Sequence, residues 1–177
     1  MIETERLKLI PCSHVHFDAL LENEEALAKL LGVSLAKGWL IFPESVPFAK
    51  RMLEKDPAAL NWGMHVIVLK AENKLIGTGG FKGAADENGM VELGYGIASE
   101  YQNCGLATEA AKGMVDHSFS HDFVKIVDAH TLAEENASGR VLRKCGMTKI
   151  DEKFDKEDGH IWHWRILREE HELLDQE

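Results

Sequence analysis

The sequence predicts an α+β fold (α/β under a looser definition), with a mixed, mostly antiparallel central sheet flanked by helices. Three consecutive strands between residues 65 and 97 are joined by short turns, so they are expected to pair antiparallel. Residues 90–131 then form a strand–helix–strand unit, and such a crossover requires a parallel pair. Residues 148–167 close the chain as a hairpin.

The N-terminal part predicts one strand and two helical segments. Residues 4–10 alternate polar and apolar side chains, as a half-buried strand does. A single helical stretch is expected over residues 13–31. A second helix is expected at residues 49–53, between Pro43 and the Asp56-Pro57 stop.

The central strands are expected at residues 65–69, 75–81 and 90–97, with polar turns between them. The hydrophobic period then changes to that of an amphipathic helix over residues 105–120, followed by a strand over residues 124–131.

A short helix is expected at residues 137–145, with Asn136 as N-cap and Gly146 just beyond its end. The chain of 177 residues fits one domain, over residues 1–168. Residues 169–177 form an acidic tail that is expected to fray or to be solvated.

Charge and hydropathy exclude several classes of protein. The chain has 20 basic and 30 acidic residues, a formal net charge of −10, which argues against binding nucleic acid. An acidic surface would attract cationic substrates such as amines or simply keep the protein in solution, and charge alone does not decide between these. No stretch approaches the roughly 18 apolar residues that a membrane-spanning helix needs, so no membrane association is expected.

The first residues and the cysteines predict a cytoplasmic protein. Acidic residues stand where a secretory signal would carry its basic segment. Cys12, Cys104 and Cys145 are odd in number and scattered, which fits free thiols in a reducing compartment.

The most informative segment, residues 98–110, joins a predicted strand to a predicted helix. Gly105 and Ala107 let the backbone turn and approach a ligand closely. The first amides of a helix lack intrahelical partners and form an anion site suited to a phosphate or pyrophosphate. The same small residues would equally serve tight helix–sheet packing, and geometry alone leaves both interpretations open.

The spacing Gln102-x-x-Gly105-x-Ala107 resembles the Q/R-x-x-G-x-G/A signature of the GNAT acetyltransferases, whose loop holds the pyrophosphate of acetyl-coenzyme A (acetyl-CoA). Three further segments resemble the RimJ/RimL-like branch of that family: Thr4-Glu5-Arg6-Leu7, Glu92-Leu93-Gly94-Tyr95, and Asn136-Ala137-Ser138 leading to Val141-Leu142-Arg143-Lys144-Cys145-Gly146-Met147. The resemblance extends from Thr4 to about Leu167.

The resemblance implies a splayed parallel strand pair and direct acetyl transfer from acetyl-CoA to a primary amine of a small molecule or of a peptide or protein N-terminus. It implies no covalent enzyme intermediate and no metal. The implied cofactor-binding residues are Ile97, Ala98, Gln102, Asn103, Cys104, Gly105, Leu106, Ala107, Thr108 and Asn136. The partners would be acetyl-CoA and an amine acceptor, with a homodimer the commonest assembly for such proteins.

The reaction needs a neutral amine. With a lysine-like pKa of about 10.4, deprotonation at pH 7 costs about 4.6 kcal/mol, so a general base is expected. Glu92 is the candidate; the competing interpretation is a carboxylate paired with a neighbouring cation. His65 and His130 are weaker candidates, because a single strand histidine is more often structural.

Three further roles follow from the resemblance. A backbone N–H of Gly96, Ile97 or Ala98 would stabilise the charge on the thioester oxygen. Ser138 would protonate the leaving thiolate, or bond its own helix backbone instead. Asn136 would bind the pantetheine amides, cap its helix, or do both.

The chain departs from the family pattern at two places. Asn136 and Ser138 are one residue apart, where the family often writes N-x-x-S, and Glu135 takes the alternative position. The helix through Met147 lacks the tyrosine that many relatives use as the acid. These departures motivate an alternative function, an acyl-CoA-binding sensor or interaction domain without turnover.

Other candidates are weaker. Cys104 near a helix N-terminus invites a nucleophilic role, but direct transfer needs no thiol. His117 and His121 have metal-ligand spacing without a third ligand, which favours a solvated helix face. His160, Trp162, His163 and Trp164 on the last predicted strand are expected to pack, the alternative being that one face lines an acceptor pocket. Glu109 is expected to complement the helix dipole. Nucleotide hydrolysis is disfavoured because GxxxxGK[ST] is absent.

Overall fold

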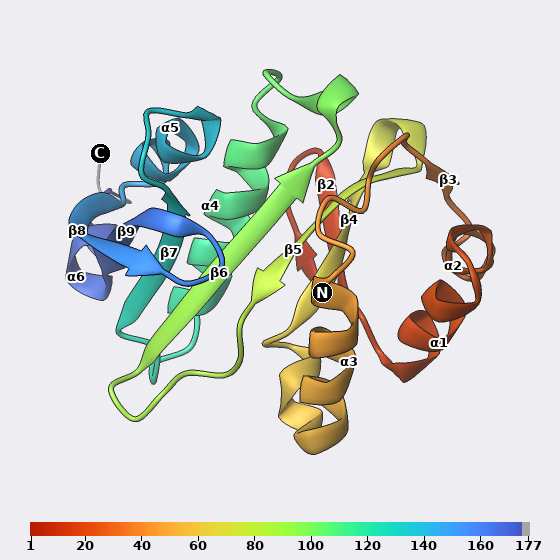
Figure 1. Cartoon of the computed structure of the whole chain (residues 1–177), viewed down its shortest axis with the longest axis horizontal. Coiled ribbons are helices and arrows are strands. Elements are labelled where there is room, and N and C mark those ends of the chain that lie inside the picture. Colours follow the sequence, from red (N-terminus) through yellow and green to blue (C-terminus); the bar gives the residue numbers. More distant parts are fainter. Residues whose placement is uncertain (175–177) are drawn as a thin grey trace.

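The computed structural model, described for residues 1–174, is built on a nine-stranded mixed sheet (Figure 1). The strands are β1 (Ile2–Glu3), β2 (Leu7–Pro11), β3 (Ser34–Leu35), β4 (Met64–Leu69), β5 (Lys74–Phe81), β6 (Met90–Ile97), β7 (Ile126–Leu132), β8 (Thr148–Asp155) and β9 (Gly159–Leu167). Their order is β1-β2-β4-β5-β6-β7-β9-β8, with β3 also paired to β5. The β6–β7 and β3–β5 pairs are parallel and the others antiparallel, which confirms the predicted fold class.

Helices cover both faces of the sheet. They are α1 (His14–Glu22), α2 (Glu24–Leu31), α3 (Ser45–Lys55), α4 (Leu106–Phe119), α5 (Ala137–Lys144) and α6 (Arg168–Leu174), with short 3-10 turns at Pro57–Leu60, Lys70–Glu72 and Ser99–Tyr101. In Figure 1, α4 and α5 lie on one side of β6 and α3 lies on the other. The buried face of α4 packs on β5 and β6 and fixes the orientation of its N-terminus relative to the sheet.

The parallel pair diverges part-way along its length. Residues Met90 to Glu92 of β6 pair with Ile126 to Asp128 of β7, and beyond that point β6 pairs only with β5. The strands therefore separate after Glu92, as the family resemblance implied. The opening faces the N-termini of α4 and α5.

The expected single helix over residues 13–31 is wrong in one respect, because it is two helices. Asn23 is extended (φ −173°), so it ends α1, and its Oδ1 accepts a hydrogen bond from the Ala26 amide at 2.8 Å. Asparagine is a preferred N-cap residue, so the signal was present in the sequence. The helix expected at residues 49–53 extends over the whole of α3.

Residues 169–177 were expected to fray or to be solvated, and fraying is wrong for the part that the structure describes, whereas Glu169, Glu170 and Glu172 are exposed to solvent. Helix α6 spans Arg168–Leu174, and the buried His171 lies 2.7 Å from an Asp116 carboxylate oxygen on α4. Residues 175–177 lie outside the described part, and the domain boundary at residue 168 stays a prediction. Within residues 1–174, no helix has the length and apolar character needed to cross a membrane.

Candidate functional site

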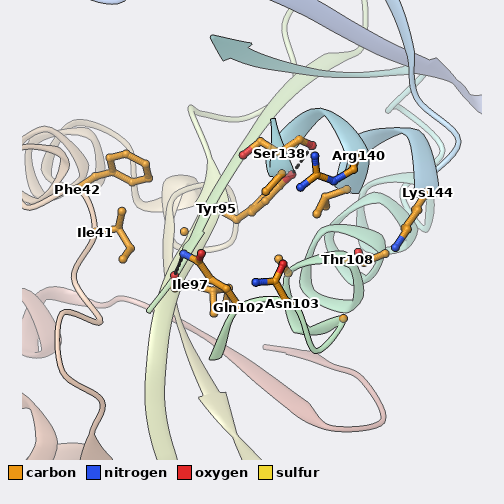
Figure 2. Close-up of a pocket in the computed structure, with 15 residues that line it drawn as sticks. Ile41, Phe42, Tyr95, Ile97, Gln102, Asn103, Thr108, Ser138, Arg140 and Lys144 are labelled. Atoms are coloured by element: carbon orange, nitrogen blue, oxygen red, sulfur yellow. Dashed lines mark hydrogen bonds between the residues drawn. The ribbon is translucent and has the colours of Figure 1, made fainter. Parts of the chain in front are cut away.

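A cavity of about 360 Å³ occupies the opening between β6 and the two helix N-termini (Figure 2). It is lined by Ile41, Phe42, Tyr95, Gly96, Ile97, Gln102, Asn103, Gly105, Ala107, Thr108, Ala137, Ser138, Arg140, Val141 and Lys144. We call it the loop cavity, because residues 102–108 form one side of it.

The loop ends in a backbone turn that requires glycine. Gly105 has φ +80° and precedes the first residue of α4, and Asn103 is also left-handed, at φ +61°. The first hydrogen bond of the helix runs from the Glu109 amide to the Gly105 carbonyl at 3.0 Å. The amides of residues 106–108 come before it and find no backbone acceptor within residues 1–174. They form the N-terminal donor set that binds anions in other proteins.

Gln102 fixes the loop to the sheet. Its side-chain Nε2 donates to the Ile97 carbonyl at 3.0 Å, as Figure 2 shows. The first residue of the predicted signature thus joins the end of β6 to the loop. Small residues at 105 and 107 then leave the backbone accessible from the cavity.

Glu109 joins the loop helix to the N-terminal segment. Its carboxylate accepts hydrogen bonds from the Thr4 hydroxyl at 2.6 Å and from the Arg6 amide and Nε at 2.7 and 2.6 Å. Arg6 also donates from Nη1 to the Cys104 carbonyl at 3.0 Å. Burial alone would raise the pKa of Glu109, but these hydrogen bonds lower it below the usual value. Sequence reasoning assigned Glu109 only to the helix dipole and missed these contacts.

Two cations of α5 line the same cavity. Arg140 and Lys144 are four residues apart, and in Figure 2 Arg140 reaches toward Ser138 while Lys144 reaches toward Thr108. Neither has an ion-pair partner in the described part of the chain. By contrast, Arg143 on the same helix makes a bidentate pair with Glu135, at 2.6 and 2.8 Å. Positive charge is thus concentrated beside the loop in a protein of net charge −10.

A second cavity of about 420 Å³ adjoins the first, on the side of α3. Phe42 and Tyr95 line both cavities. The Tyr95 hydroxyl donates to the Ser138 carbonyl at 3.3 Å, and burial raises the pKa of Tyr95, so the phenol stays protonated at neutral pH. We call the second cavity the α3 cavity.

Residues 6–148 match the family model described as "Acetyltransferase (GNAT) domain", which is most of the chain. The chain belongs to the GNAT acetyltransferases. A curated relative is the uncharacterized N-acetyltransferase YjdG of Bacillus subtilis, 28% identical over 148 residues that cover 82% of this chain and 88% of that protein. The chain is thus an acetyltransferase by family and by relatives.

Solved GNAT structures share this fold. The ribosomal L7/L12 α-N-protein acetyltransferase RimL, in complex with coenzyme A, aligns with TM-score 0.68 at 16% identity, over 93% of this chain and 95% of that one. Spermidine N-acetyltransferase from Vibrio cholerae, in complex with coenzyme A and spermine, aligns with TM-score 0.65 at 17% identity, over 95% and 99%. These neighbours act on different acceptors, so the likeness establishes the fold and not the acceptor.

Most of the site residues predicted for this acetyltransferase line the loop cavity. Those that line it are Ile97, Gln102, Asn103, Gly105, Ala107, Thr108 and Ser138. Besides Glu92, four predicted residues do not line it: Ala98 donates its amide to the Ile76 carbonyl at 2.8 Å, Leu106 is buried, Cys104 is exposed with its thiol on neighbouring carbonyls, and Asn136 caps α5.

Asn136 therefore has the capping role that the sequence left open. Its Oδ1 accepts from the Gly139 amide at 2.9 Å. Ser138 makes no side-chain hydrogen bond to its helix backbone within residues 1–174, so its hydroxyl remains available to the cavity it lines.

Glu92, the predicted base, lines neither cavity. Its carboxylate pairs with the Lys82 ammonium and accepts from His130 Nδ1 at 2.9 Å. Burial favours the neutral acid, but the hydrogen bonds from His130 and Lys82 outweigh it and lower the pKa of Glu92 to about 2. Glu92 is thus paired with the neighbouring Lys82 cation, which was the interpretation that competed with a role as general base.

The other histidines have packing roles. His65 is buried with Nδ1 on the Gly63 carbonyl, and desolvation lowers its pKa to about 4. His117 and His121 pack against Trp62, with ring centroids 5.7 and 5.1 Å from it. Residues 1–174 contain no group of three or more His, Cys, Asp or Glu side chains arranged to hold a metal ion.

Proposed function

We propose that this acetyltransferase transfers an acetyl group directly from acetyl-CoA to a primary amine, with both substrates bound at once. The observation that carries the proposal is the adjacency of two cavities that share Phe42 and Tyr95. The carrier would occupy the loop cavity and the amine the α3 cavity, so that the acetyl group and the nitrogen meet between them. Holding the two reactants together in this way converts a bimolecular step into an effectively unimolecular one.

The loop cavity supports binding of a diphosphate. Three unpaired amides, at residues 106–108, and the cations Arg140 and Lys144 supply donors and positive charge from two helices. Hydrogen bonds to a charged group contribute about 1.5–3 kcal/mol each, so this set is sufficient to anchor a pyrophosphate. Gln102 would act indirectly, by holding the loop against β6.

The backbone of β6 supplies a donor for the thioester oxygen. The Ala98 amide is bonded to the Ile76 carbonyl of β5, and successive amides of a strand point to opposite edges. The Ile97 amide therefore points away from β5, toward the opening that β7 has left. We assign the oxyanion contact to Ile97, one of three residues that the sequence offered.

Proton transfer to the leaving thiolate would involve Ser138 or Tyr95. Both line the loop cavity, and Tyr95 is held protonated next to Ser138. Glu92 has no direct contact with either cavity, so we assign it to positioning Lys82 and His130 rather than to taking the amine proton.

Calorimetry and a thiol-release assay test the proposal. Acetyl-CoA should bind with a one-to-one stoichiometry, and free thiol should appear only when an amine acceptor is added. Binding without thiol release for any acceptor would support the silent acyl-CoA sensor instead. Absence of heat at millimolar acetyl-CoA would overturn the proposal altogether.

A further inference from the structure

The α3 cavity has an apolar interior. Its base is formed by the buried side chains of Met64, Thr78 and Phe81 and by the backbone of three glycines, Gly79, Gly80 and Gly94. Side chains of α3 and of the segment before it form its walls: Phe42, Phe48, Ala49 and Met52. A volume of about 420 Å³ is within the range of small-molecule sites, roughly 300–1,000 Å³.

Among residues 1–174, the three charged side chains that line this cavity are all exposed to solvent, which places them at its edge. Glu44 comes from the start of α3 and Glu157 from the turn between β8 and β9. The remaining charge is Lys82, whose ammonium is paired with the Glu92 carboxylate. The unpaired charge offered to a ligand is therefore acidic.

We propose that the acceptor is a small primary amine with one cationic nitrogen on a compact apolar body, such as an arylalkylamine or alkylamine. This inference rests on the proposed function and names its acceptor class. The carboxylates at the edge attract the ammonium form, and the apolar body displaces water from the base of the cavity. Phe42 and Tyr95, which are shared with the loop cavity, border the point of transfer.

Two other acceptor classes fit this lining less well. A polyamine needs several acidic partners along its length, whereas the interior residues Met52, Met64 and Phe81 offer none. A peptide N-terminus brings amide groups that must be hydrogen-bonded when buried. Among residues 1–174, the uncharged polar side chains in the lining are Ser45, Thr78 and Tyr95, and the Tyr95 hydroxyl already donates to the Ser138 carbonyl. These are too few to satisfy an extended backbone.

Gly94 gives this inference a selective test. A Cβ added at Gly94 meets no atom within 4 Å, and the residue lines the α3 cavity but not the loop cavity. Larger side chains at this position would therefore fill the space of the acceptor without disturbing the fold. Val15, which is 60% exposed on α1, offers a matched control for added apolar bulk.

The experiment measures kcat/KM by thiol release for phenethylamine, hexylamine, spermidine and a Ser-Ala peptide, together with acetyl-CoA affinity by calorimetry. We expect the two apolar amines to exceed spermidine and the peptide at least tenfold. In the series Gly94→Ala, Gly94→Val and Gly94→Leu, KM for these amines should rise stepwise, by tenfold or more at Leu. The affinity for acetyl-CoA should stay within twofold in this series, and Val15→Leu should change neither quantity.

The outcomes separate the two proposals. Preferred turnover of spermidine or the peptide, or an unchanged KM in Gly94→Leu, would overturn the acceptor class alone. Absence of turnover with every amine would overturn the proposed acetyl transfer as well, even with acetyl-CoA binding intact. Failure of acetyl-CoA to bind the unmodified protein would overturn the proposed function and the acceptor class with it. A folded Gly94→Leu variant is verified by its retained acetyl-CoA affinity.

Discussion

The Glu92 carboxylate accepts a hydrogen bond from Nδ1 of His130 at 2.9 Å, across the point where β6 and β7 diverge. The His130 ring stacks on His163, with centroids 4.6 Å apart, and His163 lies 2.7 Å from the buried Asp128. Arg165 adds two hydrogen bonds to the same Asp128 carboxylate, at 2.8 Å each. Glu92 thus belongs to a polar network that crosses three strands.

We predict that Glu92→Gln lowers stability more than turnover. Loss of a carboxylate bonded to two partners should reduce the free energy of unfolding by about 1.5–3 kcal/mol at pH 7, while kcat/KM changes less than tenfold. Chemical denaturation and thiol release measure the two effects. A drop in kcat/KM of a thousandfold with unchanged stability would restore Glu92 as the catalytic base.

The pairing of Glu92 with Lys82 and His130 also makes the free energy of unfolding depend on pH. Because the folded pKa of Glu92 is lowered to about 2 from 4.5, its contribution is present above the unfolded pKa and is lost as the pH falls toward 2. The difference in unfolding free energy between the unmodified protein and Glu92→Gln should therefore shrink from pH 6 to pH 3. A constant difference over that interval would contradict the assigned pKa.

The pH dependence of turnover should follow the acceptor amine. Within residues 1–174, no histidine lines the α3 cavity, and histidine is the side chain whose ordinary pKa lies near neutrality. We expect kcat/KM to rise about tenfold per pH unit from pH 6.5 to 8.5, as the neutral fraction of the amine grows. A plateau that begins near pH 7 would indicate an enzymatic base that this structure does not identify.

Gly105 should be required for binding acetyl-CoA. Its φ of +80° is unfavourable for other residues, and an added Cβ would lie 3.4 Å from Nη2 of Arg6. We expect Gly105→Val to weaken acetyl-CoA binding at least a hundredfold by calorimetry. Gly32→Val is the control, because Gly32 has a similar φ of +67° with no atom near its Cβ and lies outside both cavities. Equal loss of binding in both variants would show that backbone strain, and not the loop, is responsible.

Arg140 and Lys144 should contribute to affinity by charge. Arg140→Gln and Lys144→Gln are each expected to raise the Kd for acetyl-CoA about tenfold at low salt, with a smaller effect at 0.5 M salt because of screening. Arg143→Gln should leave the Kd within twofold, since Arg143 is on the same helix but is paired with Glu135. A larger effect at Arg143 than at Arg140 would contradict the assigned orientation of α5.

The sequence predicted those parts of the site that depend on local backbone chemistry. The backbone turn at Gly105 and the N-cap at Asn136 follow from residue type and position, and both are confirmed. The strand divergence that exposes the loop came from the family resemblance alone. No periodic pattern covers Ile41 and Phe42, which lie in a loop. Nothing in the sequence therefore indicated that Ile41 lines the loop cavity or that Phe42 lines both cavities.

Long-range contacts explain the remaining differences. The Lys82–Glu92–His130 arrangement depends on the register between three strands, which the sequence of any one strand does not specify. The i, i+4 spacing of Arg140 and Lys144 is visible in the sequence, but it does not show that neither side chain forms an ion pair within residues 1–174. The α6 helix was missed because its acidic composition suggested a solvated end, while His171 packs beside α4.

The contact between Arg6 and Glu109 has a consequence for how the chain acquires activity. The two residues are 103 positions apart, and closing a contact over so long a loop is entropically costly and slow. During refolding, the helix and sheet signals should therefore recover before acetyl-CoA binding does.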